Sequence, residues 1–157
     1  MTDVIADQGQ PANPLNQTRE QVYASQAYND VVRFCDAHKK QEERDSYKSM
    51  VQSLPVLVRT AGLAQALAFV NTRDGQRRAI LAHLDGLLHH DLGGETLLTR
   101  SRTAKLGEYL YLTRQVMSAL LWYKRYAEWL LDKDRTAKST PVANDAAPAP
   151  AEEETRL

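Results

Sequence analysis

The sequence holds a single cysteine, Cys35, so an intramolecular disulfide framework is excluded and a reducing, cytoplasmic location is expected. The stretch MTDVIADQGQPANP has no basic segment followed by an apolar run, so we expect no secretory signal there. Long apolar runs are also missing. In the most apolar stretch, residues 53–73, Pro55, Arg59 and Gly62 interrupt the span that a membrane helix needs. We therefore expect a protein that does not interact with membranes.

A net charge is absent as well, because 20 basic side chains balance 20 acidic ones. The balance hides a gradient along the chain. Residues 1–45 carry 5 basic and 8 acidic side chains, residues 46–135 carry 13 and 8, and residues 136–157 carry 2 and 4. The middle of the chain is therefore net positive, while both ends are net acidic. A modestly basic body suits an anionic partner without requiring one.

The two ends of the sequence lack apolar periodicity. Residues 1–15 contain Pro11 and Pro14 among small polar residues, and residues 136–157 are rich in Ala, Pro and Glu. Neither segment can bury enough apolar surface to offset the entropy lost on ordering. We expect both segments to be disordered, the second as an acidic tail, and residues 16–135 to form one helical domain.

Helical periodicity extends through that domain, and no strand pattern is found. Thr18 followed three residues later by Gln21 is typical of a capping box at a helix start. Ala27, Val31 and Phe34 then follow at helical spacing, which predicts the buried face of this first helix. The polar stretch at residues 39–45, KKQEERD, predicts a loop after it.

Four further helices are expected after that loop. Pro55 lies inside the first of them and should kink it, and Gly62 suits its end. The last helix is the longest. The expected ranges are 45 or 46 to about 62, 63–70, 74 to about 90, and 101–134, with a short extra turn near 95–99. The predicted fold class is therefore all-α: a single compact bundle of five to six helices with a long C-terminal helix.

The last helix has a wide apolar face, with an aromatic row roughly opposite. The apolar face contains Leu106, Tyr109, Thr113, Val116, Leu120, Tyr123, Ala127 and Leu131. The aromatic row contains Tyr111, Trp122 and Trp129, with Arg114 and Arg125 beside it. Such a row is typical of a protein interface, and it also suits stacking on exposed bases. The alternative is that the helix runs centrally and is buried on two sides.

No residue pattern predicts catalysis or a metal site. His83 and His90 are seven residues apart and lack the i, i+4 pairing of helical metal ligands. Cys35 has a helical neighbour in His38, but a nucleophile also needs an oxyanion site and an orienting third group. A buried core cysteine is the simpler interpretation. We expect a protein that is not an enzyme and has neither cofactor nor metal.

Several cations stand where local helix stability does not explain them. Arg77 and Arg78 lie in the first turn of a predicted helix, where the helix dipole disfavours positive charge, so either a solvated face or an anionic partner accounts for them. Arg100, Arg102 and Lys105 form another basic group at the loop entering the last helix, where flexible basic residues suit phosphate contacts. Arg59 lies near a helix end, where it either caps carbonyls or meets a partner.

Two segments resemble a known family. They are LPVLVRTAGLAQALAF, residues 54–69, and EYLYLTRQVMSALLWYKRYAEWLL, residues 108–131. Together they are similar to the small all-helical subunit of the Cmr-type (type III-B) CRISPR RNA-guided effector complex, and the resemblance spans most of residues 18–133. The matching positions are Leu54, Pro55, Val58, Arg59, Gly62, Leu63, Phe69, Tyr109, Thr113, Arg114, Trp122, Lys124, Arg125, Tyr126, Ala127 and Glu128. The chain departs from the pattern at Gln115 and Tyr123.

This resemblance implies a non-catalytic scaffold subunit in antiviral defence. The implied partners are the backbone and large subunits of the effector complex, other copies of the same chain, and the guide RNA and target RNA. We predict that the cations contact RNA phosphates without reading sequence. The predicted nucleic-acid-binding residues are Lys48, Arg59, Arg77, Arg78, Arg102, Lys105, Arg114, Lys124 and Arg125, and the predicted protein-interface residues are Tyr111, Trp122 and Trp129.

Two other functions remain open at this point. A free-standing helical adaptor that binds only protein would show no salt-dependent association with nucleic acid. A metal hydrolase built around His83 and His90 would require a stoichiometric metal ion.

Overall fold

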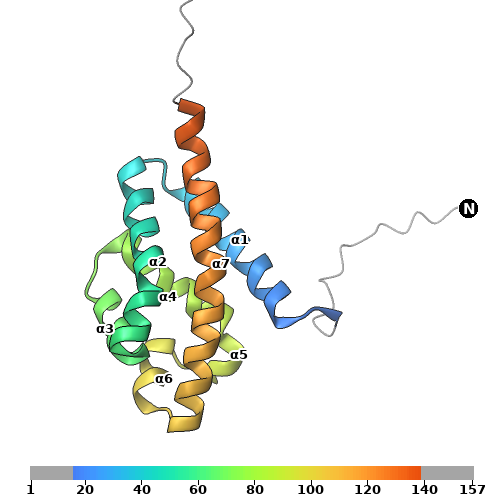
Figure 1. Ribbon diagram of the computed structural model, residues 1–157, viewed down its shortest axis with the longest axis vertical. Coiled ribbons are helices and arrows are strands. Elements are labelled where there is room, and N and C mark those ends of the chain that lie inside the picture. Colours follow the sequence, from blue (N-terminus) through green and yellow to red (C-terminus); the bar gives the residue numbers. More distant parts are fainter. Residues whose placement is uncertain (1–15, 139–157) are drawn as a thin grey trace, which may run out of the picture.

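The computed structural model describes residues 16–138, with side chains described for residues 16–132. These residues form seven helices and no strand (Figure 1). The all-α prediction with a long C-terminal helix is confirmed. The helices are α1 (Arg19–Ala37), α2 (Gln41–Ala61), α3 (Leu63–Asn71), α4 (Gly75–Leu87), α5 (His89–Leu92), α6 (Leu97–Thr103) and α7 (Leu106–Lys138).

Helix α7 runs the length of the bundle, and α1 and α2 pack along it (Figure 1). Helix α2 also packs on α3 and α4, and α6 packs on α3 and α4 near the start of α7. One apolar cluster, with contributions from all seven helices, forms the core. The core positions predicted for α3 and α4 are confirmed as buried: Leu63, Ala66, Leu67, Val70, Ile80, Leu84 and Leu87.

A buried polar network ties four helices together at the centre of the bundle. The Tyr123 hydroxyl on α7 donates to Asp30 Oδ2 on α1 at 2.6 Å. The His83 ring of α4 lies parallel to the Tyr123 ring, with 5.7 Å between the ring centroids. The Tyr47 hydroxyl of α2 lies 2.9 Å from His83 Nδ1. Because buried polar groups are costly when unpaired, these contacts fix the mutual register of the helices.

The start of α1 is as predicted, but the expected loop at residues 39–45 is mostly helix. Thr18 and Gln21 form the capping box. Helix α2 begins at Gln41, four residues before the earliest predicted start. The reason is Arg44, which is buried and donates from Nε to His38 O at 2.7 Å and from a terminal nitrogen to Cys35 O at 3.0 Å. This arginine satisfies carbonyls that the end of α1 leaves unpaired, so the two helices need only a short connection.

The predicted start of the last helix at Ser101 is wrong, because the chain breaks between α6 and α7. Ala104 has an extended backbone, with φ −63° and ψ 141°, which ends α6. Because of this break, α7 begins at Leu106 and not at Ser101. Leu106, which was predicted to lie on the apolar face, is 74% exposed. The sequence carries no Pro or Gly between 101 and 106 that could have signalled this corner.

The predicted disordered segments, 1–15 and 136–157, lie outside the described residues apart from the end of α7. That helix continues past its expected end at Asp134 and reaches Lys138. In the part of the chain that the structure describes, no helix combines the length and the apolar content that crossing a bilayer requires.

Candidate functional site

The residues considered for catalysis do not come together in a reactive centre. His83 is half-buried and packs against the Tyr47 and Tyr123 rings, whereas His89 and His90 lie exposed beyond the end of α4. The His38 ring stacks on Phe34, with centroids 4.1 Å apart. Cys35 is half-buried rather than fully buried as predicted. Within residues 16–138, no group of three or more His, Cys, Asp or Glu side chains is arranged to hold a metal ion.

The aromatic row predicted on α7 faces α1 for most of its length. The Trp122 indole donates to Glu20 Oε2 of α1 at 2.7 Å, and Tyr111 hydrogen-bonds to Arg19 of α1. Helix α1 covers this side of α7 only in part, because Trp122 is half-buried whereas Tyr111 is 37% exposed. Trp129 is more exposed still, at 56%, although its ring contacts Tyr28 with centroids 6.2 Å apart.

The predicted cations separate into two surfaces, of which the first is formed by α2 and α7. The Lys48 ammonium bonds to Asp132 at 2.6 Å and Gln52 Nε2 donates to Glu128 at 3.2 Å, so the two helices run antiparallel. Val56 and Arg59 follow Gln52 by about one and two helical turns on the outward side of α2. In the same antiparallel register, they lie beside the middle of α7. We call this surface the mixed face; it contains Val56, Arg59, Leu110, Arg114, Leu121 and Arg125, all exposed.

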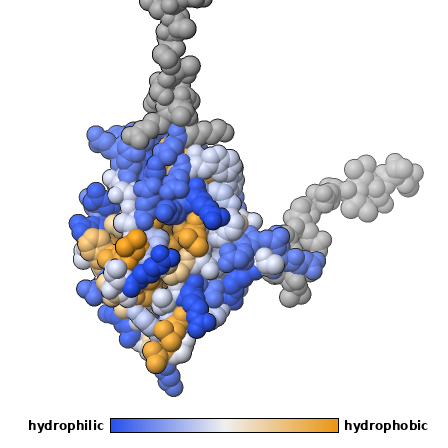
Figure 2. Space-filling view, in the orientation of Figure 1, coloured by the Kyte–Doolittle hydropathy of each residue, from blue (hydrophilic) through white to orange (hydrophobic). Residues whose placement is uncertain are grey.

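Arginines and aliphatic side chains alternate on the mixed face. Leu110 and Leu121 are each 46% exposed, and Val56 is 59% exposed. Figure 2 shows orange apolar patches interspersed with blue polar ones over α2 and α7. Beside Val56, a hollow of about 450 Å³ is lined by Ser53, Leu57, Thr60 and Phe69 as well. Arg59 and Arg114 form no ion pair with another described residue, and Arg125 lies over the Trp122 ring at 5.7 Å.

The second surface carries cations from α4, α6 and the corner before α7. Arg77, Arg78, Arg102 and Lys105, which we call the α4–α6 cations, form no ion pair with another described residue. Arg78 lines a hollow of about 370 Å³ between α4 and α6, together with Asn71, Ala82, Asp85, Thr96 and Leu98. Burial raises the pKa of the Asp85 carboxyl, which accepts the Leu97 backbone N–H at 2.6 Å.

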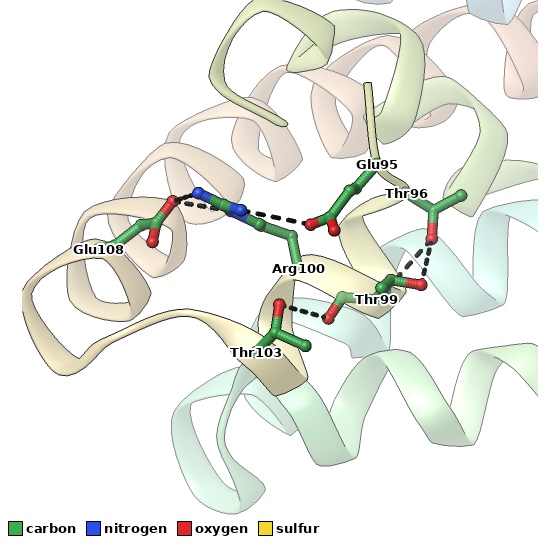
Figure 3. A network of polar contacts seen from close by, with 6 residues as sticks. All are labelled: Glu95, Thr96, Thr99, Arg100, Thr103 and Glu108. Atoms are coloured by element: carbon green, nitrogen blue, oxygen red, sulfur yellow. Dashed lines mark hydrogen bonds and ion pairs between the residues drawn. The ribbon is translucent and has the colours of Figure 1, made fainter. Parts of the chain in front are cut away.

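Two basic residues near these surfaces are neutralised by carboxylates of the same chain. Arg100 donates from Nε to Glu108 at 2.7 Å and from a terminal nitrogen to Glu95 at 3.3 Å, which joins the two sides of the α6–α7 corner (Figure 3). Hydrogen bonds to Glu108 and Glu95 raise the pKa of Arg100. Lys48, a predicted RNA contact, is largely buried and pairs with Asp132. Neither cation is available to a phosphate without losing its partner.

The aliphatic members of the mixed face are the residues that the sequence-based reasoning missed. Leu110 and Leu121 fall on the same arc of a helical wheel as Arg114 and Arg125, so plotting all α7 side chains against the arginines could have found them. Val56 could not be assigned in this way, because its position beside α7 depends on the register between the two helices. Lys124, another predicted RNA contact, is half-buried on α7.

Comparison with known proteins identifies the family of the chain. Residues 19–130 match the family described as CRISPR-associated protein (Cas_Cmr5). A curated relative, the CRISPR system Cmr subunit Cmr5 of Thermus thermophilus, is 42% identical over 118 residues, which cover 74% of this chain and 98% of the relative. A crystal structure of a CRISPR-associated Cmr5 family protein from the same organism superposes with a TM-score of 0.63 at 43% identity, covering 73% of this chain and 98% of that one. The chain therefore belongs to the Cmr5 family of CRISPR-associated proteins.

Proposed function

We propose that this chain is a non-catalytic small subunit of a Cmr-type CRISPR ribonucleoprotein. It packs along the backbone and large subunits with further copies of itself, and helps to hold the duplex of guide RNA and target RNA in antiviral defence. Membership of the Cmr5 family supports this role, because the related Thermus protein is named as a subunit of a CRISPR Cmr system.

The observation that carries the proposal is the distribution of charge on the bundle. The mixed face and the α4–α6 cations present basic side chains that form no ion pair with another described residue, and the core is filled by apolar side chains and a satisfied polar network. Cations of this kind bind phosphates electrostatically and without base recognition, since no base-reading geometry is needed for such contacts. A scaffold that grips an RNA backbone needs these features and no reactive group.

The test is assembly and RNA binding by the complete particle. The tagged chain should co-purify with a guide-RNA-loaded, multi-subunit particle. A particle reconstituted without the chain should bind target RNA more weakly, with a smaller dependence of affinity on salt concentration. The free-standing adaptor predicts the opposite: the chain would be recovered without guide RNA, and its omission would leave target-RNA affinity unchanged at every salt concentration.

A further inference from the structure

The two cationic surfaces differ in their apolar content. Among the side chains described, the exposed large apolar ones lie on α1, α2, α3 and α7, and none lies on α4, α5 or α6. The mixed face therefore combines three arginines with three exposed aliphatic side chains, whereas the α4–α6 cations have one large exposed apolar neighbour in sequence, Leu106, which follows Lys105 at the corner. This difference separates two kinds of partner.

The aliphatic side chains of the mixed face argue against RNA as its partner. Removing apolar surface from water stabilises a complex by roughly 25 cal/mol per Å². A phosphate backbone offers no apolar surface that could cover Val56, Leu110 and Leu121, so contact with RNA would not gain this stabilisation. Nor are these side chains aromatic, so they cannot stack on bases in the way that single-stranded RNA is held. A protein surface, in contrast, can cover them.

The arginines of the mixed face indicate which side chains the surface of the partner protein should present. Arg59 and Arg114 have no carboxylate partner among the described residues, and covering an unpaired charge is costly. Arginine is also among the residues that dominate binding energy in protein interfaces when a carboxylate meets it. The partner surface should therefore present apolar side chains flanked by Asp or Glu.

A second copy of the chain does not meet this description when two mixed faces meet. Such a symmetric contact would bring Arg114 and Arg125 of one copy against the arginines of the other, and like charges at close range oppose binding. We propose that the mixed face docks a different, acidic and apolar protein subunit, so that Arg59, Arg114 and Arg125 anchor protein while the α4–α6 cations hold the RNA. This inference rests on the proposed function and assigns a partner to each surface.

Two charge-matched variants and one uncharged variant test the assignment. Arg114→Ala with Arg125→Ala and Arg78→Ala with Arg102→Ala each remove two positive charges, one pair from each surface. Leu110→Ser with Leu121→Ser removes apolar surface from the mixed face without changing the charge. Each variant is added to a guide-RNA-loaded particle that lacks the subunit. The measurements are the concentration needed for half-maximal incorporation and the salt dependence of target-RNA affinity.

The leucine variant should need more than about tenfold more protein for incorporation, because interface anchors typically cost over 1 kcal/mol each when removed. The arginine pair of α7 should behave similarly. The Arg78/Arg102 variant should enter the particle normally, and its slope of log affinity against log salt should become shallower by about 1 to 2. A urea unfolding curve for each variant keeps loss of folding separate from loss of docking.

Three outcomes would overturn the assignment. They are normal incorporation of the leucine variant, a shallower salt slope for the Arg114/Arg125 pair with normal incorporation, or a concentration-dependent self-association of the free chain that the leucine variant abolishes. Failure of the proposed function is distinguished from these, because then the unmodified chain would not enter the particle at all.

Discussion

The Tyr123 hydroxyl donates a 2.6 Å hydrogen bond to Asp30 Oδ2, and both side chains are buried between α7 and α1. Gln26 supplies the other described contact to this carboxylate, donating from Nε2 to Oδ1 at 3.1 Å. Burial and the bond to Asp30 raise the pKa of Tyr123, so the hydroxyl keeps its proton as a donor throughout the physiological range. This buried bond to a carboxylate thus joins α1 to α7 in the interior, in addition to the more exposed bond between Trp122 and Glu20.

Replacing Tyr123 by Phe should lower the free energy of unfolding by about 1–3 kcal/mol, because the Asp30 carboxylate loses its strongest donor and stays buried. Equilibrium urea unfolding followed by circular dichroism measures the change. Tyr28→Phe is the matched control, since that ring is 40% exposed, and should stay within about 0.5 kcal/mol of the unmodified protein. Equal stability of the two variants would show that the buried bond contributes nothing.

The free energy of unfolding should decrease as the pH drops below about 6.5, because His83 binds a proton more readily in the unfolded chain than in the folded one. Burial lowers the pKa of this histidine from its ordinary 6.5, and the nearby Asp30 opposes the shift only in part. Below pH 6.5, His83 binds a proton in the unfolded chain but not yet in the folded chain. The free energy of unfolding therefore decreases with falling pH until the pKa of His83 in the folded chain is reached. Above that range His83 contributes no pH dependence.

The measurement for His83 is the difference in unfolding free energy between about pH 7.5 and pH 5.5, compared with His83→Gln. The glutamine retains an oxygen that can accept from the Tyr47 hydroxyl, and it does not titrate. The variant should therefore lose less stability over this interval. His89→Gln makes the same chemical change at an exposed histidine. An identical pH dependence in the unmodified protein and His83→Gln would refute the prediction.

Periodicity predicted those parts of the fold that depend on local sequence. The stripe Ala27, Val31 and Phe34 is buried, and the capping box at Thr18 forms, because both need only residues within one helix. The start of α2 and the α6–α7 corner were missed for the opposite reason. Arg44 bonds to carbonyls six and nine residues away, and Arg100 joins Glu95 and Glu108 across a break that no Pro or Gly marks.

The residues of the candidate site could likewise be predicted only where local sequence determines them. The sequence located most of the exposed cations, since Arg59, Arg78 and Arg125 are recognisable by type and by position on a helix. It could not tell that Lys48 is paired, because Asp132 is 84 residues away. It also could not join Val56 to the α7 leucines, because this depends on helix packing. Pairing between distant residues decides which charges remain available, and single-sequence patterns carry no information on it.

Gly62→Ala should destabilise the protein by about 1–3 kcal/mol, because Gly62 has φ +85°, a conformation that side-chain-bearing residues rarely adopt. An added Cβ would also lie 3.2 Å from the Tyr109 hydroxyl, which accepts the Ala64 backbone N–H at 3.3 Å. The corner between α2 and α3 should therefore lose both its backbone conformation and this bond.

Gly86→Ala provides the control for Gly62 by thermal unfolding. It lies inside α4, and an added Cβ would meet nothing within 4 Å. This substitution should stabilise the protein by roughly 0.5–1 kcal/mol, because alanine loses less backbone entropy in a helix. Opposite signs for the two Gly→Ala changes are expected, and a neutral or stabilising Gly62→Ala would show that the corner relaxes freely.

The Lys48–Asp132 pair should matter little to stability and not at all to RNA binding. Its Nζ lies 2.6 and 2.7 Å from the two carboxylate oxygens, but Asp132 is 43% exposed at its side chain, and solvent screens the attraction. A double-mutant cycle with Lys48→Met and Asp132→Asn should therefore give a coupling energy below about 1 kcal/mol in urea unfolding.

The same double variant tests whether a cation that is paired within the chain contributes to RNA binding. Because Lys48→Met with Asp132→Asn leaves the local net charge unchanged, the particle that contains it should keep its target-RNA affinity and its salt slope. Arg78→Met, which removes a cation without a described carboxylate partner, should make that slope shallower by about 1. A loss of affinity in the double variant as large as that of Arg78→Met would mean that Lys48 leaves Asp132 to bind phosphate in the assembled particle.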